Sequence, residues 1–305
     1  MTVAQTLEFE TTGRSDTARW WPAARRALAI VGVLLAVCLL WEGYRALGMA
    51  IDNNLPCGQS KMPVCPNDRS MPHLWTIMGA LIEPVRSGSD EQILLMMLIK
   101  AALFTWREAA TGFVLGSLIG FALGAVFGRF LFLERGLMPY IVASQTVPLL
   151  AIAPMVVIWG GRLNLPAWAA VSIISAYLTF FPVTINTLRG LRSPNPTAVE
   201  LMRSYAASEM QILWKLRLPA ALPYIFTALK VSATASVIGA IVGELPTGIA
   251  DGLGRVLLSF SYFFTLGPEK LYAAILGSAL LGIVFAAIIA LAERLIVPEG
   301  RRLAE

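Results

Sequence analysis

Six apolar stretches divide this chain, and each is long enough to cross a membrane as a helix, which takes about 20 residues. Hydrophobic residues make up 57% of the sequence and charged residues only 14%. A water-soluble domain has about 25% charged residues, so this apolar excess does not fit into one globular core. We therefore predict an all-α polytopic membrane protein with about six transmembrane helices, over residues 27–47, 92–128, 137–160, 165–188, 221–243 and 271–294.

Lys and Arg residues flank these stretches, and such residues favour the cytoplasmic side of a membrane. With the N-terminus inside, fourteen of the flanking basic residues fall on the cytoplasmic side and seven on the external side. The net charge of +5 does not predict nucleic-acid binding, because the basic residues form no continuous stripe. The count predicts a multi-pass protein of the cell inner membrane, with cytoplasmic tails over 1–26 and 296–305, an external loop over 48–91 and a core membrane domain over 92–295.

The first apolar stretch, 27–47, has two interpretations. A cleaved signal peptide has a short basic region before its apolar core. Here the preceding region is long and contains the acidic residues Glu8, Glu10 and Asp16. We therefore predict an uncleaved transmembrane helix, with a signal peptide as the alternative.

The polar loop 48–91 contains two of the three cysteines, Cys57 and Cys65, and a short helix is predicted over 73–85. In an oxidising external compartment these two cysteines either form a disulfide or remain free thiols. Cys38 lies in an apolar stretch and is interpreted as a small hydrophobic residue. The chain has a single histidine, His73, and no metal site is predicted.

Glycine recurs at every fourth position in the second apolar stretch. One face of the predicted helix carries Gly112, Gly116, Gly120, Gly124 and Gly128. Small residues at this spacing let another helix approach closely within lipid. The pattern therefore predicts a tight helix–helix contact, and it indicates no chemistry.

The third apolar stretch contains Pro139, Pro148 and Pro154. Proline inside a helix removes a backbone hydrogen bond and clashes with the preceding turn. A membrane protein tolerates this where neighbouring groups satisfy the freed backbone. We therefore predict that the helix over 137–160 is kinked or broken.

A charged insert, 195–219, separates the fourth and fifth apolar stretches. Thr197–Glu200 and Ser208–Gln211 each match a capping box, which is a helix start. The insert is therefore predicted as two short helices joined by a bend near Ala206–Ser208. Pro219 is expected to end it, and Pro223 to begin the fifth transmembrane helix.

The same insert resembles the hallmark of binding-protein-dependent ABC importer permeases. That hallmark reads Glu, two Ala, three residues, Gly, nine residues, Ile, one residue and Leu-Pro. Leu201 and Met202 depart from the two alanines, and the matching positions here are Glu200, Ala206 (for Gly), Leu216 (for Ile) and Leu218–Pro219. The resemblance covers about residues 92–295, and four further stretches are similar to the nitrate, sulfonate and taurine subgroup: VPLLAIAPMVVIWGG (147–161), FPVTINTLRGLRS (181–193), LPAALPYIFTALKVSATASVIGAIVGE (218–244) and GLGRVLL (252–258).

The resemblance implies partners for this chain. The insert would be the coupling helix, seated in a groove of a cytoplasmic ABC ATPase subunit that binds ATP and Mg. A second permease copy would complete a dimer in the lipid, and an external binding protein would deliver the solute for alternating-access transport. The expected ATPase contacts are Glu200, Arg203, Ser204, Tyr205, Ala206, Ala207 and Ser208.

No enzymatic centre or bound cofactor is predicted in this chain. It has no GxxxxGK[ST] phosphate loop, no HExxH and no GxSxG. The glycines of 252–254 are interpreted as turn and packing residues. A membrane-embedded enzyme, or a secondary carrier that needs no ATPase, is the alternative. A secondary carrier usually shows an internal repeat, and none is seen.

Polar residues inside apolar stretches are costly and are therefore candidates for the solute path. Hydrogen bonding between helices is the alternative role for each of them. The subgroup resemblance suggests nitrate, an alkanesulfonate, or a heterocycle such as a pyrimidine or a riboflavin-like compound, and sparse positive charge disfavours a small inorganic anion. The candidate residues are Gln145, Thr146, Thr184, Asn186 and Glu244.

Overall fold

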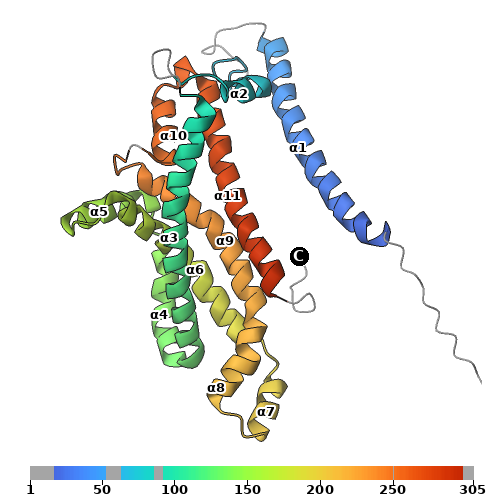
Figure 1. Ribbon diagram of the computed structural model, residues 1–305, viewed down its shortest axis with the longest axis vertical. Helices are drawn as coiled ribbons and strands as arrows, with labels where there is room; N and C mark the ends of the chain where they lie inside the picture. Colours follow the sequence, from blue (N-terminus) through green and yellow to red (C-terminus); the bar gives the residue numbers. More distant parts are fainter. Residues whose placement is uncertain (1–16, 53–62, 86–91, 250, 298–305) are drawn as a thin grey trace, which may run out of the picture. The chain divides into compact units, whose positions relative to one another are not determined.

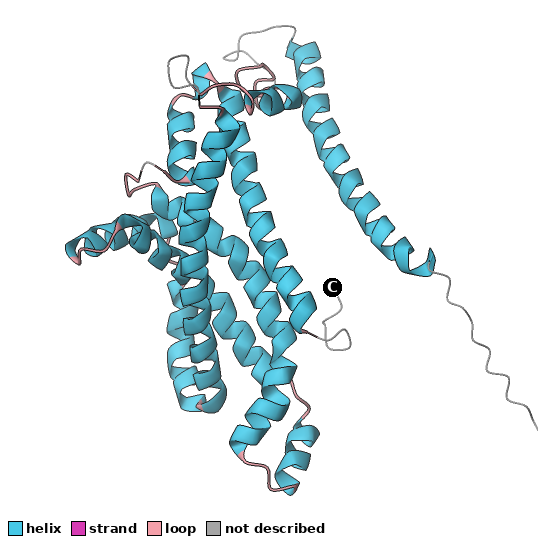
Figure 2. Ribbon diagram, viewed as in Figure 1, coloured by secondary structure: helices cyan, strands magenta, loops and turns pink. Residues whose placement is uncertain are grey.

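The computed structural model describes residues 17–52, 63–85, 92–249 and 251–297. The chain divides into two compact units, Met1–Thr76 and Ile77–Glu305, which are described separately below. Every named element in the described ranges is helical (Figure 2). The all-α prediction is therefore confirmed.

Five of the helical segments are long and apolar enough to cross a membrane, and a bent pair of shorter helices makes a sixth. This agrees with the predicted number of about six. The five lie within α1 (Thr17–Asp52), α3 (Leu94–Arg129), α6 (Ala167–Leu191), the run Glu209–Thr247 that includes α9 (Leu218–Glu244), and α11 (Pro268–Ile296) (Figure 1).

The bent pair consists of α4 (Leu131–Ser144) and α5 (Leu149–Arg162), which meet at 99°. Pro148 is the N-cap of α5 and has an extended backbone, with φ −63° and ψ 120°. The predicted break is thus confirmed and located, because proline restricts the residue before it and provides no backbone N–H for a continuing helix. Pro139 and Pro154 lie inside the two helices without breaking them.

The glycine face of α3 packs against α6, as the spacing predicted. A Cβ atom added at Gly116 would lie 2.5 Å from the carbonyl oxygen of Ala176, and one at Gly120 would lie 2.5 Å from that of Phe180. Gly112 and Gly124 are equally crowded, whereas Gly128 leaves more room. Backbone-to-backbone contact at this distance excludes any larger side chain.

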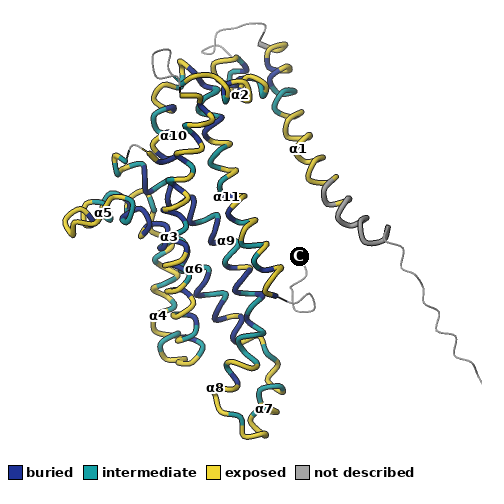
Figure 3. The backbone as a smooth tube through the Cα atoms, viewed as in Figure 1, coloured by how far each residue is buried: buried dark blue, intermediate teal, exposed yellow. Residues whose placement is uncertain are grey.

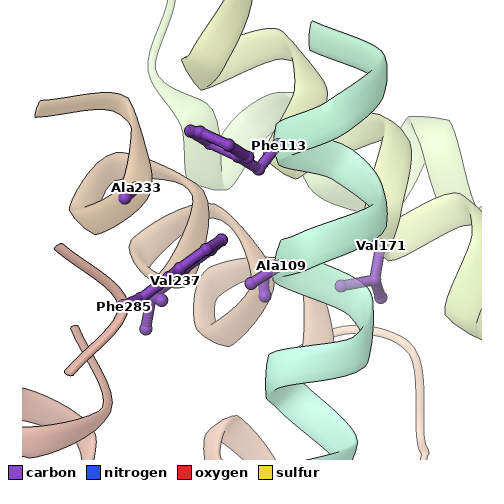
Figure 4. Close-up of a cluster of buried hydrophobic side chains, with 7 residues drawn as sticks. Ala109, Phe113, Val171, Ala233, Val237 and Phe285 are labelled. Atoms are coloured by element: carbon purple, nitrogen blue, oxygen red, sulfur yellow. The ribbon is translucent and has the colours of Figure 1, made fainter. Parts of the chain in front are cut away.

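The core of the second unit lies where α3, α6, α9 and α11 meet. The rings of Phe113 and Phe285 pack edge to face with centroids 5.1 Å apart, an arrangement that aromatic pairs favour. The buried cluster around them contains Ala109, Val171, Ala233, Val237 and Ala240 (Figure 4). Outward positions of these helices are apolar and exposed (Figure 3), which suits a lipid environment.

In the first unit, residues 63–76 pack against the last turns of α1. The indole of Trp41 donates to the carbonyl of Pro72 at 3.2 Å, and Arg45 pairs with Asp68. Glu42 accepts the Leu74 backbone N–H at 3.1 Å and contacts the ring of His73. Helix α1 continues to Asp52, so the loop predicted over 48–91 begins later than expected, and the short predicted helix is α2 (Leu74–Ala80).

The described residues include only two of the three cysteines, so the structure tests part of the cysteine prediction. Cys65 is disulfide-bonded, and Cys38 is an exposed free thiol in α1. Cys57 lies outside the described residues. The pairing of Cys57 with Cys65 therefore stays a prediction.

Two features of the second unit differ from expectation. Pro219 does not end the insert, because α8 (Glu209–Ile212), the π-helix η2 (Leu213–Arg217) and α9 form one helical run. The wider π-turn pairs the Leu218 N–H with the Leu213 carbonyl and shifts the hydrogen-bond register just before Pro219, so the helical run continues past this proline. Pro223 accordingly lies inside α9 and does not begin it.

A helix that was not expected, α10 (Leu253–Tyr262), follows α9, and a 3-10 turn (Phe264–Leu266) leads into α11. Gly252 is the N-cap of α10, and an added Cβ there would overlap the carboxyl group of Glu244. The glycines at 252 and 254 are therefore packing residues, as interpreted, but they open a helix.

Candidate functional site

The insert begins with α7 (Pro196–Ser204), which is capped by Asn195 and not by Thr197 as expected. The Asn195 side chain accepts the Thr197 backbone N–H at 3.0 Å, and Pro196 occupies the first helical position. Both features favour a helix start, since Asn is a strong N-cap and proline suits the first turn. The first helix of the insert thus starts two residues earlier than the capping-box pattern indicated.

The bend between the two insert helices is a Schellman motif centred on Ala206. The Ala206 N–H bonds to the Arg203 carbonyl at 2.9 Å, and the Ala207 N–H bonds to the Met202 carbonyl at 3.0 Å. Ala206 has φ +56°, in the left-handed region that glycine prefers. This position corresponds to the glycine of the hallmark, so the geometry explains why glycine suits it.

The second insert helix begins with the predicted capping box. The Ser208 hydroxyl accepts the Gln211 N–H at 3.3 Å, and the Gln211 side chain accepts the Ser208 N–H at 2.8 Å. This reciprocal pair satisfies two backbone donors at the start of α8. The bend is therefore fixed on both sides by hydrogen bonds.

Ion pairs connect the insert to the end of α3. Arg203 contacts Glu209 at 2.9 Å across the bend, and Arg129 at the end of α3 lies 3.8 Å from the same carboxylate. Exposed pairs of this kind each contribute about 0–1 kcal/mol. They orient the insert more than they stabilise it.

The insert lies at one end of the second unit (Figure 1), and several of its large apolar side chains are exposed. Tyr205 is 81% exposed, and Met210 and Trp214 are each 62% exposed. Leu201 is exposed as well. Large apolar side chains exposed within a charged segment are candidates for a protein–protein contact.

Of the seven residues expected to contact an ATPase, all are exposed except Ala207, which is partly buried. Leu201, Met210 and Trp214 were not among them, although apolar letters within a charged insert could have indicated them. Two hollows of about 320 and 390 Å³ lie at the base of the insert, and Gly128, Leu191 and Arg217 line both.

Gln145 and Thr146 lie together at the break between α4 and α5. Both are exposed and line a cavity of about 400 Å³. The other side of this cavity is aromatic, and the Tyr177 hydroxyl donates to the Ser144 carbonyl across it. Among the described residues no charged side chain lines this cavity, whose remaining members are Val147, Pro148, Leu149, Leu178, Phe180 and Phe181.

The other three path candidates lie elsewhere in the second unit. The Thr184 hydroxyl is buried and donates to the Phe180 carbonyl at 2.7 Å, and Asn186 donates to the Pro182 carbonyl at 2.8 Å. Glu244 is fully buried and bonded to Thr105 on α3 and to Gly254 on α10. These three residues make hydrogen bonds within or between helices.

A body of membrane-length helices with an exposed helix-pair insert is the architecture of a membrane-embedded transport subunit. The chain belongs to the family described as binding-protein-dependent transport system inner membrane component, which it matches over residues 112–297. It is the membrane-spanning permease subunit of an ABC importer.

Curated relatives and solved structures agree with this family. The chain is 35% identical over 239 residues to a formylaminopyrimidine transport permease of Halalkalibacterium halodurans, covering 74% of this chain and 90% of the relative. It is 30% identical over 166 residues to a riboflavin transport permease of Chloroflexus aurantiacus, covering 54% and 59%. Its fold is similar to a chain of the inward-facing MetNI methionine ABC transporter, with TM-score 0.57, 17% identity, and coverage of 69% of this chain and 98% of that one.

Proposed function

We propose that this permease transports a small, neutral, planar heterocycle into the cell, and that a cytoplasmic ABC ATPase drives it through the insert. The insert itself carries the proposal, because its bend is fixed by hydrogen bonds while its apolar side chains face outward. An external binding protein delivers the solute, and two permease copies alternate between outward- and inward-open states. ATP and Mg are bound by the ATPase and not by this chain.

The docking surface consists of Leu201, Tyr205, Met210 and Trp214 together with the charged rim of Glu200, Arg203 and Glu209. Apolar anchors inside a polar rim are the usual anatomy of a specific protein interface. The Arg203–Glu209 pair holds the two halves of the surface in one geometry. A rigid surface of this kind is suited to transmit the movement of a partner.

Copurification tests the docking of an ATPase. The tagged chain is purified in mild detergent beside a variant with Tyr205→Ala and Ala206→Glu, and the bound proteins are identified by mass spectrometry and assayed for ATPase activity. The matched control is Tyr262→Ala, which removes an equally exposed tyrosine (76%) on α10, outside the insert.

We expect an ATPase subunit to copurify with the parent and with the control, and to be lost from the insert variant. Equal recovery from all three would exclude the insert as the docking site. Absence of any ATPase from the parent would favour a carrier or enzyme that works alone.

The substrate class follows from the cavity at the α4–α5 break. Its lining combines aromatic rings of Tyr177 and Phe181 with the amide of Gln145 and the hydroxyl of Thr146, and it has no charged side chain. Rings favour stacking on a planar heterocycle, and an amide fixes its orientation by hydrogen bonds. The relative with 35% identity is named for formylaminopyrimidine, which supports this class, while the relatives named for riboflavin and for aliphatic sulfonates have similar identities of 30% and 32%.

Uptake into proteoliposomes tests the substrate class. The vesicles contain this chain with its ATPase and binding protein, and the labelled solutes are a formylaminopyrimidine, riboflavin, nitrate and an alkanesulfonate. We expect uptake of a heterocycle only, and an about tenfold loss with Gln145→Leu, since one polar contact contributes about 1–2 kcal/mol. The control Thr227→Val removes a hydroxyl that bonds within α9, and uptake of nitrate or sulfonate alone would overturn the assignment.

The orientation is the remaining element of the proposal. The excess of basic residues on one side supports a cytoplasmic insert and cytoplasmic termini, with the cysteine-containing loop outside. Labelling intact cells with an impermeant maleimide tests it, using Ser208→Cys in a Cys38→Ala background. Labelling of the introduced thiol only after cell lysis is expected, and its labelling in intact cells would reverse the topology.

A further inference from the structure

Two carboxyl groups lie together in the membrane body, away from the insert and from the cavity at the helix break. Glu108 is on α3 and Glu244 is at the end of α9. Both side chains are completely buried. A buried carboxylate is costly unless its charge is balanced or accepted by hydrogen-bond donors.

Glu244 has the donors that an ionised carboxylate requires. The Thr105 hydroxyl donates to its Oε1 at 2.6 Å, and the Gly254 backbone N–H donates to its Oε2 at 2.5 Å. The Leu253 N–H in turn donates to the Thr105 oxygen at 2.9 Å. Glu244 thus lies at the N-terminus of α10, where the helix dipole favours negative charge.

Glu108 has the opposite environment. Among the described residues neither of its oxygens meets a hydrogen-bond donor. Thr105, which donates to Glu244, lies three residues before Glu108, nearly one turn of α3, so the Glu108 carboxyl group is on the helix face that meets Glu244. Two ionised carboxylates are acceptors only, so they bond to each other only when one of them carries a proton.

The charged residues around the pair do not neutralise it. Arg107 is exposed and lies over the ring of Trp168, with its guanidinium carbon 4.4 Å from the ring centroid. Asp251 and Arg255, beside the start of α10, are exposed. On α9, Lys230 pairs with Glu293 of α11 at 3.1 Å. Within the described ranges, no cation forms an ion pair with either carboxyl group.

We propose that Glu108 and Glu244 form a proton-binding site inside the membrane body. Glu108 keeps the proton and donates a hydrogen bond through it to the ionised Glu244. The pair then carries one negative charge, which the Thr105 hydroxyl and the α10 N-terminus stabilise. This bond joins α3 to the junction of α9 and α10. Loss of the proton leaves two adjacent anions in an apolar interior, and their repulsion separates these helices.

Infrared spectroscopy of the purified full-length chain tests the proposal without requiring transport, so its outcome is independent of the proposed substrate and ATPase. A protonated carboxyl group has a C=O stretching band that ionised carboxylates lack, and the band shifts in D₂O. We expect the band at neutral pH in the parent and in the control Glu83→Gln, an exposed carboxylate, and its absence in Glu108→Gln. A parent without the band, or a band that persists in Glu108→Gln, would overturn the proposal.

Thermal unfolding separates a proton site from a merely structural pair and also covers a variant that folds poorly. We expect the stability of the parent to fall as pH rises above about 4.3, the pKa of an unperturbed glutamate, and to keep falling through neutral pH, because the folded chain holds a proton that the unfolded chain has released. Glu108→Gln should not show this loss, because an amide N–H replaces the proton permanently, whereas Glu244→Gln should be less stable at every pH. If the parent has no pH dependence and sodium chloride stabilises it more than choline chloride, a cation occupies the site and the proton assignment is wrong.

Discussion

The contact between α3 and α6 and the insert of α7 and α8 are opposite solutions to helix packing. Along α3 the glycines leave no room for a single added carbon atom, and the two helices are fixed over most of their length. In the insert, caps, a Schellman motif and ion pairs fix the start of each helix and the bend between them. Its large apolar side chains are exposed. The difference indicates a helix bundle that resists deformation and an insert whose surface is available to a partner.

Widening the α3–α6 contact should have the largest effect. In Gly116→Val the new side chain overlaps the Ala176 carbonyl, so we expect more than about 3 kcal/mol of destabilisation, or loss of the folded protein. The measurement is the fraction that remains monodisperse on size-exclusion chromatography after heating. Gly277→Val is the control, since nothing lies within 4 Å of its added Cβ, and equal loss in both would contradict the packing argument.

A charge on the insert should leave the helix bundle folded and weaken the docking of the ATPase. For Met210→Asp we expect the affinity for the ATPase to fall about tenfold or more, since a side chain buried at an interface contributes more than about 1 kcal/mol. The melting temperature should not change, because this side chain is 62% exposed. Leu266→Asp, 83% exposed on the 3-10 turn before α11, should leave affinity unchanged, and a matching loss there would point to a general effect of charge.

Removing the cap of α8 should destabilise the insert locally. Ser208→Ala loses the hydroxyl of the capping box, which is worth about 1 kcal/mol. We expect faster amide hydrogen exchange over 208–212 and unchanged exchange in α3. Thr197→Ala is the comparison, because Asn195 and not Thr197 caps α7, and loss of protection in α7 would mean that the cap is misassigned.

The smallest expected effect is a gain in the stability of the bend. Ala206→Gly relieves a left-handed alanine, a conformation that costs about 1–2 kcal/mol, and part of this gain is offset by the flexibility of glycine in the unfolded chain. We expect a net stabilisation of the bend of about 0.5 kcal/mol, seen as slower hydrogen exchange in the insert. Ala207→Gly should not stabilise, and stabilisation of the same size there would show that backbone strain at 206 is not the cause.

Patterns with a single physical cause were predicted well from sequence. The glycine spacing indicated the face of α3 that is in close contact, and the capping box at Ser208 has the expected bonds. The partner helix of that face could not be predicted, because spacing describes one helix alone. Asn195 was missed because an Asn before a proline and a Thr within a capping pattern predict starts two residues apart.

Features that depend on tertiary contacts were not predictable. A π-turn places Pro219 where it does no harm, and only the folded chain shows that turn. The short helix α10 was hidden between glycines. Thr105 and Glu244 are 139 residues apart in sequence, so their bond, and the position of Glu108 beside it, became visible only in three dimensions. Whether Gln145 and Thr146 contact the solute remains a proposal.

The second half of the insert and Glu244, one member of the carboxyl pair, belong to the same helical rod. Residues Glu209–Thr247 form one helical run of 39 residues, which begins in the docking surface and ends beside Glu244. At 1.5 Å per residue this rod is about 58 Å long, with about 18 Å on the insert side of Ala221 and about 39 Å on the other side, so a tilt of about 5° about Ala221 displaces the insert end by about 2 Å and the opposite end by about 3 Å. In mechanical terms it is a lever, with its short arm in the insert and its fulcrum where Gly190 meets Ala221. With these arm lengths, a movement at the insert would be about doubled at the opposite end of the run.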